Sequence, residues 1–176
     1  MKTKNLPFYF LAFGLLISLK FWFASADNQA LSVLLKPTNA IFSIMTDSES
    51  AYSPDTGFYH EKFNILIDKS CAGYNFMLIN FLMVYVLVLK YVKKPHFKWL
   101  LLPLTLAFSL VITVFVNSFR IIASANFQHT IYEMLNVKQE IVHQTIGVIT
   151  YLSFLIIIYL ITEKILARKY EKINES

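Results

Sequence analysis

The chain has very little cysteine and very little charge, and each shortage excludes a class of protein. Cys71 is the only cysteine in 176 residues, so an internal disulfide, a CxxC pair and a cysteine-rich metal site are all excluded. Charged residues make up 15% of the chain while hydrophobic residues make up 56%. This balance is too apolar for a soluble domain of this length, and it indicates a membrane protein.

Several motifs that would indicate other activities are also missing. No G-x-S-x-G or similar serine element lies on an apolar run, which argues against an intramembrane serine protease. The lack of a second cysteine argues against a thiol oxidoreductase. The four histidines form no H-x-x-x-H pair and have no nearby carboxylate pair, so neither a metal nor another cofactor is expected.

Four apolar runs have the length of roughly 20 residues that is needed to cross a hydrocarbon core of about 30 Å. They cover approximately residues 6–26, 73–92, 99–119 and 141–161. The first run imitates a signal peptide, but its length and the neighbouring Lys20 and Trp22 fit an uncleaved span. The sequence therefore predicts an all-α integral membrane protein, a bundle of four transmembrane helices in a single multi-pass domain over residues 1–176.

Basic residues predict how these spans are oriented. Lysines cluster in the loop after the second run and again in the tail after residue 162, which places that loop and both chain ends in the cytoplasm. These clusters account for the net charge of +5, so no nucleic-acid partner is expected. The loop 27–70 has an acidic surplus and is expected on the outer side.

The outer loop contains two expected elements. Residues 30–45 are apolar and helix-friendly but are interrupted by Lys36-Pro37. They are short for a span, so a helix at the outer membrane interface is expected, with a fifth span as the alternative. The turn signal in residues 54–57, followed by alternating residues up to Asp68, predicts a small hairpin that leads the chain to Cys71.

Three reactive residues fall at the outer ends of three different spans. Cys71 starts the second span, Arg120 ends the third and His143 starts the fourth. A helix N-terminus, a histidine and a cation each favour the thiolate form of a cysteine. His143 is then a candidate general base and acid, and Arg120 is a candidate donor to an oxyanion. The placement predicts a catalytic nucleophile, base and cation on one membrane face.

Three polar neighbours are candidates for supporting roles. Ser70 is a candidate N-cap for the second helix, which would place Cys71 in the first turn. Asn75 follows Cys71 by one helical turn, and Asn117 precedes Arg120 by three residues. Both asparagines are candidates to hold the reactive side chains in place.

Other readings of these residues remain open. His60 and His129 also lie on the outer side and compete with His143 for the role of base, whereas His96 lies in the basic cytoplasmic loop. Taken singly, a cysteine in an apolar run is commonly a packing residue, and an arginine or histidine at a span end is commonly an interfacial anchor. A small membrane scaffold or assembly subunit is therefore the alternative to an enzyme.

Short motifs occur in a fixed order along the chain. They are Cys71-Ala72-Gly73, Asn117-Ser118-Phe119-Arg120, and His143 followed by Gly147, preceded by the segment Lys36-Pro37-Thr38-Asn39-Ala40. They resemble the C-[SA]-G, N-x-x-R and H-x-x-x-G elements of the exosortase and archaeosortase family of membrane cysteine transpeptidases, and the segment at residues 36–40 is similar to the helix that precedes its catalytic cysteine. The short chain looks most like the type-K exosortases, and the resemblance covers roughly residues 30–161. Many family members have additional N-terminal spans, which leaves the substrate choice open.

The resemblance implies a substrate and a mechanism. The substrate would be a secreted protein whose C-terminal signal consists of a short recognition motif, a transmembrane helix and a basic tail. Cleavage would occur beside the motif at the outer face of a bacterial plasma membrane, with Cys71 forming a thioester. An unknown acceptor, such as an amine or hydroxyl of a lipid or glycan, would then resolve the thioester.

Overall fold

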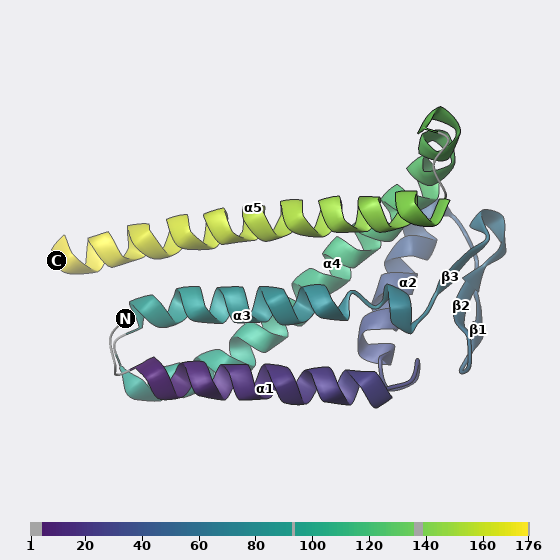
Figure 1. The fold of residues 1–176 in the computed structure, drawn as a ribbon. Coiled ribbons are helices and arrows are strands. Elements are labelled where there is room, and N and C mark those ends of the chain that lie inside the picture. Colours follow the sequence, from purple (N-terminus) through teal and green to yellow (C-terminus); the bar gives the residue numbers. More distant parts are fainter. Residues whose placement is uncertain (1–4, 93, 136–138, 176) are drawn as a thin grey trace. The chain divides into compact units, whose positions relative to one another are not determined.

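The computed structural model of the chain describes residues 5–92, 94–135 and 139–175 (Figure 1). The helices are α1 (Leu6–Ser25), α2 (Ser32–Thr46), α3 (Tyr74–Tyr91), α4 (Pro95–Leu135) and α5 (Gln139–Glu175). Three short strands lie between α2 and α3 along the chain: β1 (Ala51–Ser53), β2 (Gly57–His60) and β3 (Ile65–Ile67). Among the described residues, four helices are long and apolar enough to cross a membrane, so the predicted helical membrane fold is confirmed.

The spans agree with the sequence prediction at most of their ends, and two helices are longer than predicted. α1 and α3 match the predicted runs to within one residue at each end. α4 does not end near Arg120 but continues to Leu135, because the stretch from 121 to 127 contains neither glycine nor proline to stop it. Residues 121–135 therefore extend the helix beyond the predicted third span. α5 likewise continues through the charged tail, which is rich in good helix formers.

α2 confirms the helix that was predicted at residues 30–45. It has 15 residues, about 22 Å of helix, which is shorter than the roughly 20 residues of an ordinary span. One face is buried through Leu34, Leu35 and Phe42, while Val33 and Ile44 on the other face are exposed. This length favours the interfacial helix over the fifth span.

The packing divides the chain into two compact units, which we call unit 1 and unit 2. Unit 1 combines residues 1–25, 75–111 and 154–176, and unit 2 combines residues 26–74 and 112–153. A buried cluster in unit 1 joins Phe8 and Ala12 of α1 to Phe81, Tyr85 and Leu89 of α3. Unit 1 therefore has an apolar helix-to-helix core of its own.

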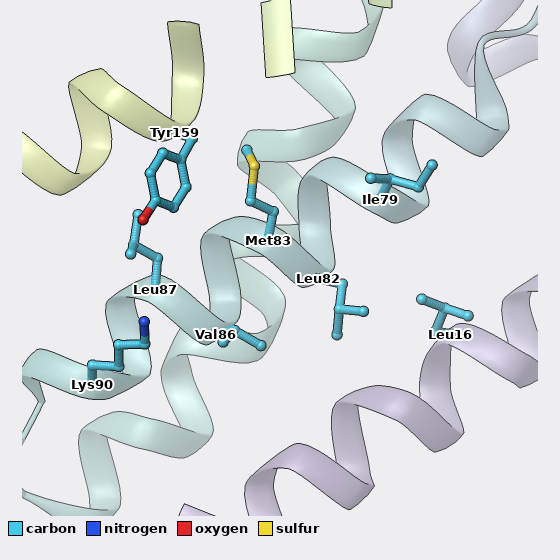
Figure 2. Close-up of a pocket in the computed structure, with 8 residues that line it drawn as sticks. All are labelled: Leu16, Ile79, Leu82, Met83, Val86, Leu87, Lys90 and Tyr159. Atoms are coloured by element: carbon cyan, nitrogen blue, oxygen red, sulfur yellow. The ribbon is translucent and has the colours of Figure 1, made fainter. Parts of the chain in front are cut away.

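Unit 1 also contains an apolar pocket (Figure 2). Its lining consists of Leu16, Ile79, Leu82, Met83, Val86, Leu87, Lys90 and Tyr159. The lysine and the tyrosine supply the polar groups, and none of these lining residues is a cysteine, serine, histidine or carboxylate. The reactive residues predicted from the sequence belong instead to unit 2.

The strands of unit 2 form an antiparallel sheet in the order β1-β2-β3. Ser53 pairs with Gly57 around the three-residue turn 54–56, so the predicted hairpin is confirmed, and β3 adds a third strand to it. Phe42 of α2 packs edge-on against His60, with ring centroids 4.6 Å apart. The sheet is thereby held on α2, and β3 leads directly into the turn that carries Cys71.

Candidate active site

Cys71 lies in a short 3-10 turn, Lys69–Cys71, that precedes α3. The Asp68 carboxylate caps this turn, because its Oδ1 accepts hydrogen bonds from Ser70 N at 2.9 Å and from Ser70 Oγ at 2.6 Å. Gly73 then adopts a positive φ of 66° and turns the chain into α3. The prediction that Ser70 caps α3 is therefore wrong, because Asp68 already binds the Ser70 hydroxyl and three residues separate Ser70 from the helix start at Tyr74.

Asn28 fastens the start of this turn to the hairpin. Its Oδ1 accepts a hydrogen bond from Lys69 N at 2.8 Å, and its Nδ2 donates to Pro54 O at 3.3 Å and Asp55 O at 3.1 Å. The Lys69 ammonium also donates to Ala26 O at 2.7 Å. Three segments of unit 2 thus meet at one buried amide, and they fix the position of the cysteine turn.

The Cys71 thiol is buried, with 8% of the residue exposed. Sγ donates to Leu66 O on β3 at 3.7 Å, and Ser70 Oγ lies 3.8 Å from Sγ. A thiol can donate to a carbonyl oxygen, which is an acceptor, so Leu66 O is the resting partner of the sulfur. Within the described part of the chain, neither Arg120 nor His143 forms a hydrogen bond with Sγ.

A chain of hydrogen bonds nevertheless connects the cysteine turn to the arginine. Asn117 Nδ2 donates to the Cys71 carbonyl oxygen, and Asn117 Oδ1 accepts from the Tyr151 hydroxyl at 2.7 Å. Arg120 Nη1 donates to Tyr151 Oη at 3.2 Å, and its guanidinium lies 5.3 Å from the centroid of the same ring, within the range of a cation–π contact. Tyr151 therefore joins Asn117 and Arg120 through one hydroxyl.

Arg120 also contacts His143, and this contact fixes the proton on the imidazole ring. Arg120 Nη2 lies 3.1 Å from His143 Nε2, and a guanidinium can only donate, so Nε2 accepts. The neutral ring then carries its proton on Nδ1, which donates to Ser124 Oγ at 2.7 Å. His143 is held as a neutral base whose lone pair, on Nε2, accepts from Arg120.

Two glycines leave room for this network. A Cβ at position 73 would lie 3.1 Å from both Asn117 Cγ and Tyr151 Oη, and a Cβ at position 147 would lie 2.8 Å from Arg120 Nε. Arg120 Nε is buried against Gly147 and has no hydrogen-bond partner among the described residues. Both glycines belong to the motifs seen in the sequence, and their lack of a side chain now has a physical reason.

The structure adds two residues that the sequence analysis missed, Ser124 and Tyr151. Ser124 lies four residues after Arg120, on the same face of α4. Tyr151 follows Gly147 by four residues and shares a face of α5 with it and with His143. Extending each motif by one helical turn would have found both residues. The sequence signal for Ser124 and Tyr151 was therefore their spacing of four residues along a helix, not a motif.

The other predicted participants lie elsewhere or outside the described side chains. Asn75 accepts a hydrogen bond from Lys20 within unit 1. The His96 ring lies next to that of Phe97, with centroids 4.5 Å apart. The side chain of His129 falls outside the described residues. Asn117 is the one supporting residue of the prediction that the structure joins to both the cysteine turn and the arginine.

His60, the remaining competitor for the base, has a local structural role. It is fully buried, its Nε2 lies 2.7 Å from Asn39 Oδ1, and its Nδ1 lies 3.0 Å from Ser48 Oγ. Burial lowers the pKa of His60, and a hydrogen bond with the Glu49 backbone opposes this effect in part. These contacts fasten β2 to α2 and the residues that follow it.

Unit 2 thus contains a thiol, a neutral imidazole and a guanidinium, and hydrogen bonds connect the latter two to the backbone of the cysteine turn. Such a set is suited to nucleophilic attack on a carbonyl, proton transfer and stabilisation of the resulting oxyanion. Among the described residues, no group of three potential metal ligands occurs. Comparison of the chain with models of known protein families, with curated proteins and with solved structures found no match.

Proposed function

We propose that the protein is a membrane cysteine peptidase or transpeptidase that cleaves the C-terminal sorting signal of secreted proteins. The observation that carries this proposal is the continuous set of contacts from Cys71 through Asn117, Tyr151 and Arg120 to His143. A packing cysteine and two interfacial anchors have no need of such a connection. The order of the three sequence motifs supports the same assignment.

The neutral state of His143 suits the first chemical step. A substrate carbonyl oxygen accepts from Arg120 and takes this donor away from His143 Nε2. Nε2 then accepts the proton of the Cys71 thiol, and Sγ forms a bond with the carbonyl carbon. The tetrahedral oxyanion remains beside the guanidinium, whose hydrogen-bond partners in the structure, Tyr151 and His143, are neutral. Its positive charge is thus available to the transition state.

The second step releases the C-terminal fragment. The carbon–nitrogen bond breaks, and His143 gives the proton from Nε2 to the leaving amine. The secreted protein stays on Sγ as a thioester. An amine or hydroxyl of a lipid or glycan acceptor then attacks the thioester carbon, the sulfur–carbon bond breaks, and the acceptor proton returns through His143 to Sγ. Water in place of the acceptor gives hydrolysis.

The proposal is tested by removing the nucleophile. Cys71→Ala should leave the protein in the membrane at its normal level and should cause the uncleaved precursor of a secreted protein to accumulate, as detected by mass spectrometry of protein C-termini in whole cells. Arg120→Ala should give the same precursor, with a loss of rate of about 100- to 1000-fold. His96→Ala is the control and should process normally.

Normal processing by Cys71→Ala would refute the proposed peptidase function. The alternative, a scaffold or assembly subunit, would then remain. A scaffold would instead be expected to lose a membrane complex when its packing residues are changed. Blue-native electrophoresis of the same variants separates these two outcomes, since the enzyme proposal predicts that Cys71→Ala migrates like the wild type.

The proposal includes an active site at the outer face of a bacterial plasma membrane. Because the chain has a single cysteine, the side of the membrane on which Cys71 lies can be tested separately by thiol labelling. A small membrane-impermeant methanethiosulfonate reagent added to intact cells should modify Cys71. The control is a Cys71→Ser protein with Lys94→Cys in the basic loop, which should be modified only after the cells are opened. The reverse pattern would show that the proposed orientation is inverted.

A further inference from the structure

In the part of the chain that the structure describes, the sheet of unit 2 has no strand beside the outer edge of β3. β1 and β2 occupy the other positions in the order β1-β2-β3. Ala51 and Ser53 pair with Tyr59 and Gly57 across the closing turn. A three-residue turn is closed by a hydrogen-bonded pair, and such pairs alternate along an antiparallel ladder. The N–H and C=O groups of Tyr59 therefore point towards β1.

The same alternation fixes the direction of the backbone groups on β3. Phe58 lies opposite Ile67, His60 opposite Ile65 and Leu66 opposite Tyr59. Since the backbone groups of Tyr59 point towards β1, the hydrogen-bonded pairs between β2 and β3 are those of Phe58 and His60. Both backbone groups of Leu66 therefore point away from β2, towards the unpaired edge. The contact between Cys71 Sγ and Leu66 O agrees with this direction, since the thiol approaches from the side that has no strand.

The nucleophile is thus bound to the one carbonyl of β3 that an incoming strand would use. We propose that the substrate binds as a fourth strand along the outer edge of β3, with its backbone paired to Leu66. This inference rests on the proposed peptidase function and specifies how the substrate is bound. The occupant is an extended peptide, because an exposed strand edge offers alternating donors and acceptors that match an extended backbone.

Pairing with Leu66 also brings the peptide bond to the sulfur. An amide N–H that donates to Leu66 O takes the position now held by the thiol proton. The carbonyl carbon of the same amide is bonded to that nitrogen, so it comes next to Sγ. Sγ lies 3.7 Å from Leu66 O, so the two groups compete for one acceptor. Substrate binding displaces the thiol from its resting partner and leaves the proton of Cys71 free for His143.

The test removes one backbone donor without removing the strand. Leu66→Pro lacks the N–H that points to the open edge, and edge positions whose N–H faces outwards tolerate proline. Tyr52→Pro makes the equivalent change on the opposite edge of the same sheet, because Tyr52 lies opposite Phe58 between the hydrogen-bonded pairs of β1.

Processing should fall at least about 10-fold in Leu66→Pro and stay within about 2-fold of the wild type in Tyr52→Pro. The measurement is a pulse-chase of the precursor that accumulates in Cys71→Ala cells. If Cys71→Ala accumulates no precursor, the proposed function fails. If it does and Leu66→Pro processes normally, only the strand-binding inference fails.

A second measurement covers the case in which Leu66→Pro does not fold. Cys71→Ala protein in lipid nanodiscs is mixed with a synthetic peptide that copies the cleavage region of the accumulated precursor, and amide hydrogen exchange is followed. The exchange of the β3 segment should slow at least about 10-fold, while that of β1 stays unchanged. Unchanged exchange in β3 at a saturating peptide concentration would overturn the inference.

Discussion

Gly147→Ala separates the chemistry of the site from the stability of the helix that carries it. A Cβ at position 147 would lie 2.8 Å from Arg120 Nε, whereas ordinary contacts begin near 3.4 Å, so the guanidinium must move by about 0.6 Å. The Arg120 bonds to Tyr151 and His143 would lengthen together. A displacement of about 1 Å in a catalytic group can cost about 100-fold in rate, so we expect processing to fall about 10- to 100-fold.

The same substitution should not destabilise the helix. Alanine is favoured over glycine in a helix interior by about 0.8–1.0 kcal/mol, and this gain offsets the displacement of one flexible side chain. Gly14→Ala in α1 is the matched control, because a Cβ there meets nothing within 4 Å. It should keep full processing. Thermal unfolding in detergent and pulse-chase of the precursor measure the two effects. Normal processing by Gly147→Ala would refute the role given to the Arg120 position.

Three further predictions concern other residues of unit 2. Tyr151→Phe removes the hydroxyl that accepts from Arg120 but keeps the ring beneath the guanidinium, so processing should fall about 10-fold with a loss of unfolding free energy of about 1–3 kcal/mol. Gly73→Ala combines a positive φ with two close contacts. It should therefore destabilise the protein by more than about 1–2 kcal/mol and abolish processing, as seen by thermal unfolding and pulse-chase. Burial keeps the pKa of His60 below its value of 6.5 in the unfolded chain, so the unfolded state binds more protons at low pH. The stability of the hairpin should thus be complete above about pH 6.5 and fall as the pH drops through the folded pKa. Hydrogen exchange of β2 at pH 5.0 and 7.5 measures this, and His60→Asn should remove the pH dependence.

Much of the fold could be predicted from the sequence because membrane spans are limited by length and composition. Apolar runs must be about 20 residues long, and the lysine clusters at their ends mark the loops. The extent of α4 beyond Arg120 could not be predicted in this way. Hydropathy marks where the apolar stretch ends, whereas helix propensity decides where the helix ends, and residues 121–127 retain that propensity.

The candidate site was predicted in part. Cys71, Arg120 and His143 were found because they are reactive types at the ends of spans. Asn117 came from its motif. The role of the Tyr151 hydroxyl was not predicted, because a tyrosine in an apolar span gives no signal by itself in the sequence. Only its contacts with Asn117 and Arg120 give it a role.

The capping of the cysteine turn was also beyond the sequence prediction. A serine just before an apolar run is a normal N-cap, and nothing in the local sequence shows that Asp68 binds its hydroxyl first. The positive φ of Gly73 separates the turn from the helix. Two local candidates therefore competed, and the Asp68 carboxylate, two residues before Ser70, forms the cap.

Under the proposed function, the resting contacts of the site favour a peptide as the substrate. The thiol proton is bound to Leu66 O, and the basic nitrogen of His143 is bound to Arg120, so neither reactive atom is available to the other. A group that releases both must offer a donor to Leu66 and an acceptor to Arg120 at the same time. An amide has these two groups on adjacent atoms, whereas an ester offers only the acceptor. We therefore expect a peptide with an ester in place of the scissile amide to react more slowly than its greater chemical reactivity would suggest, and a faster reaction would contradict the role assigned to Leu66 O.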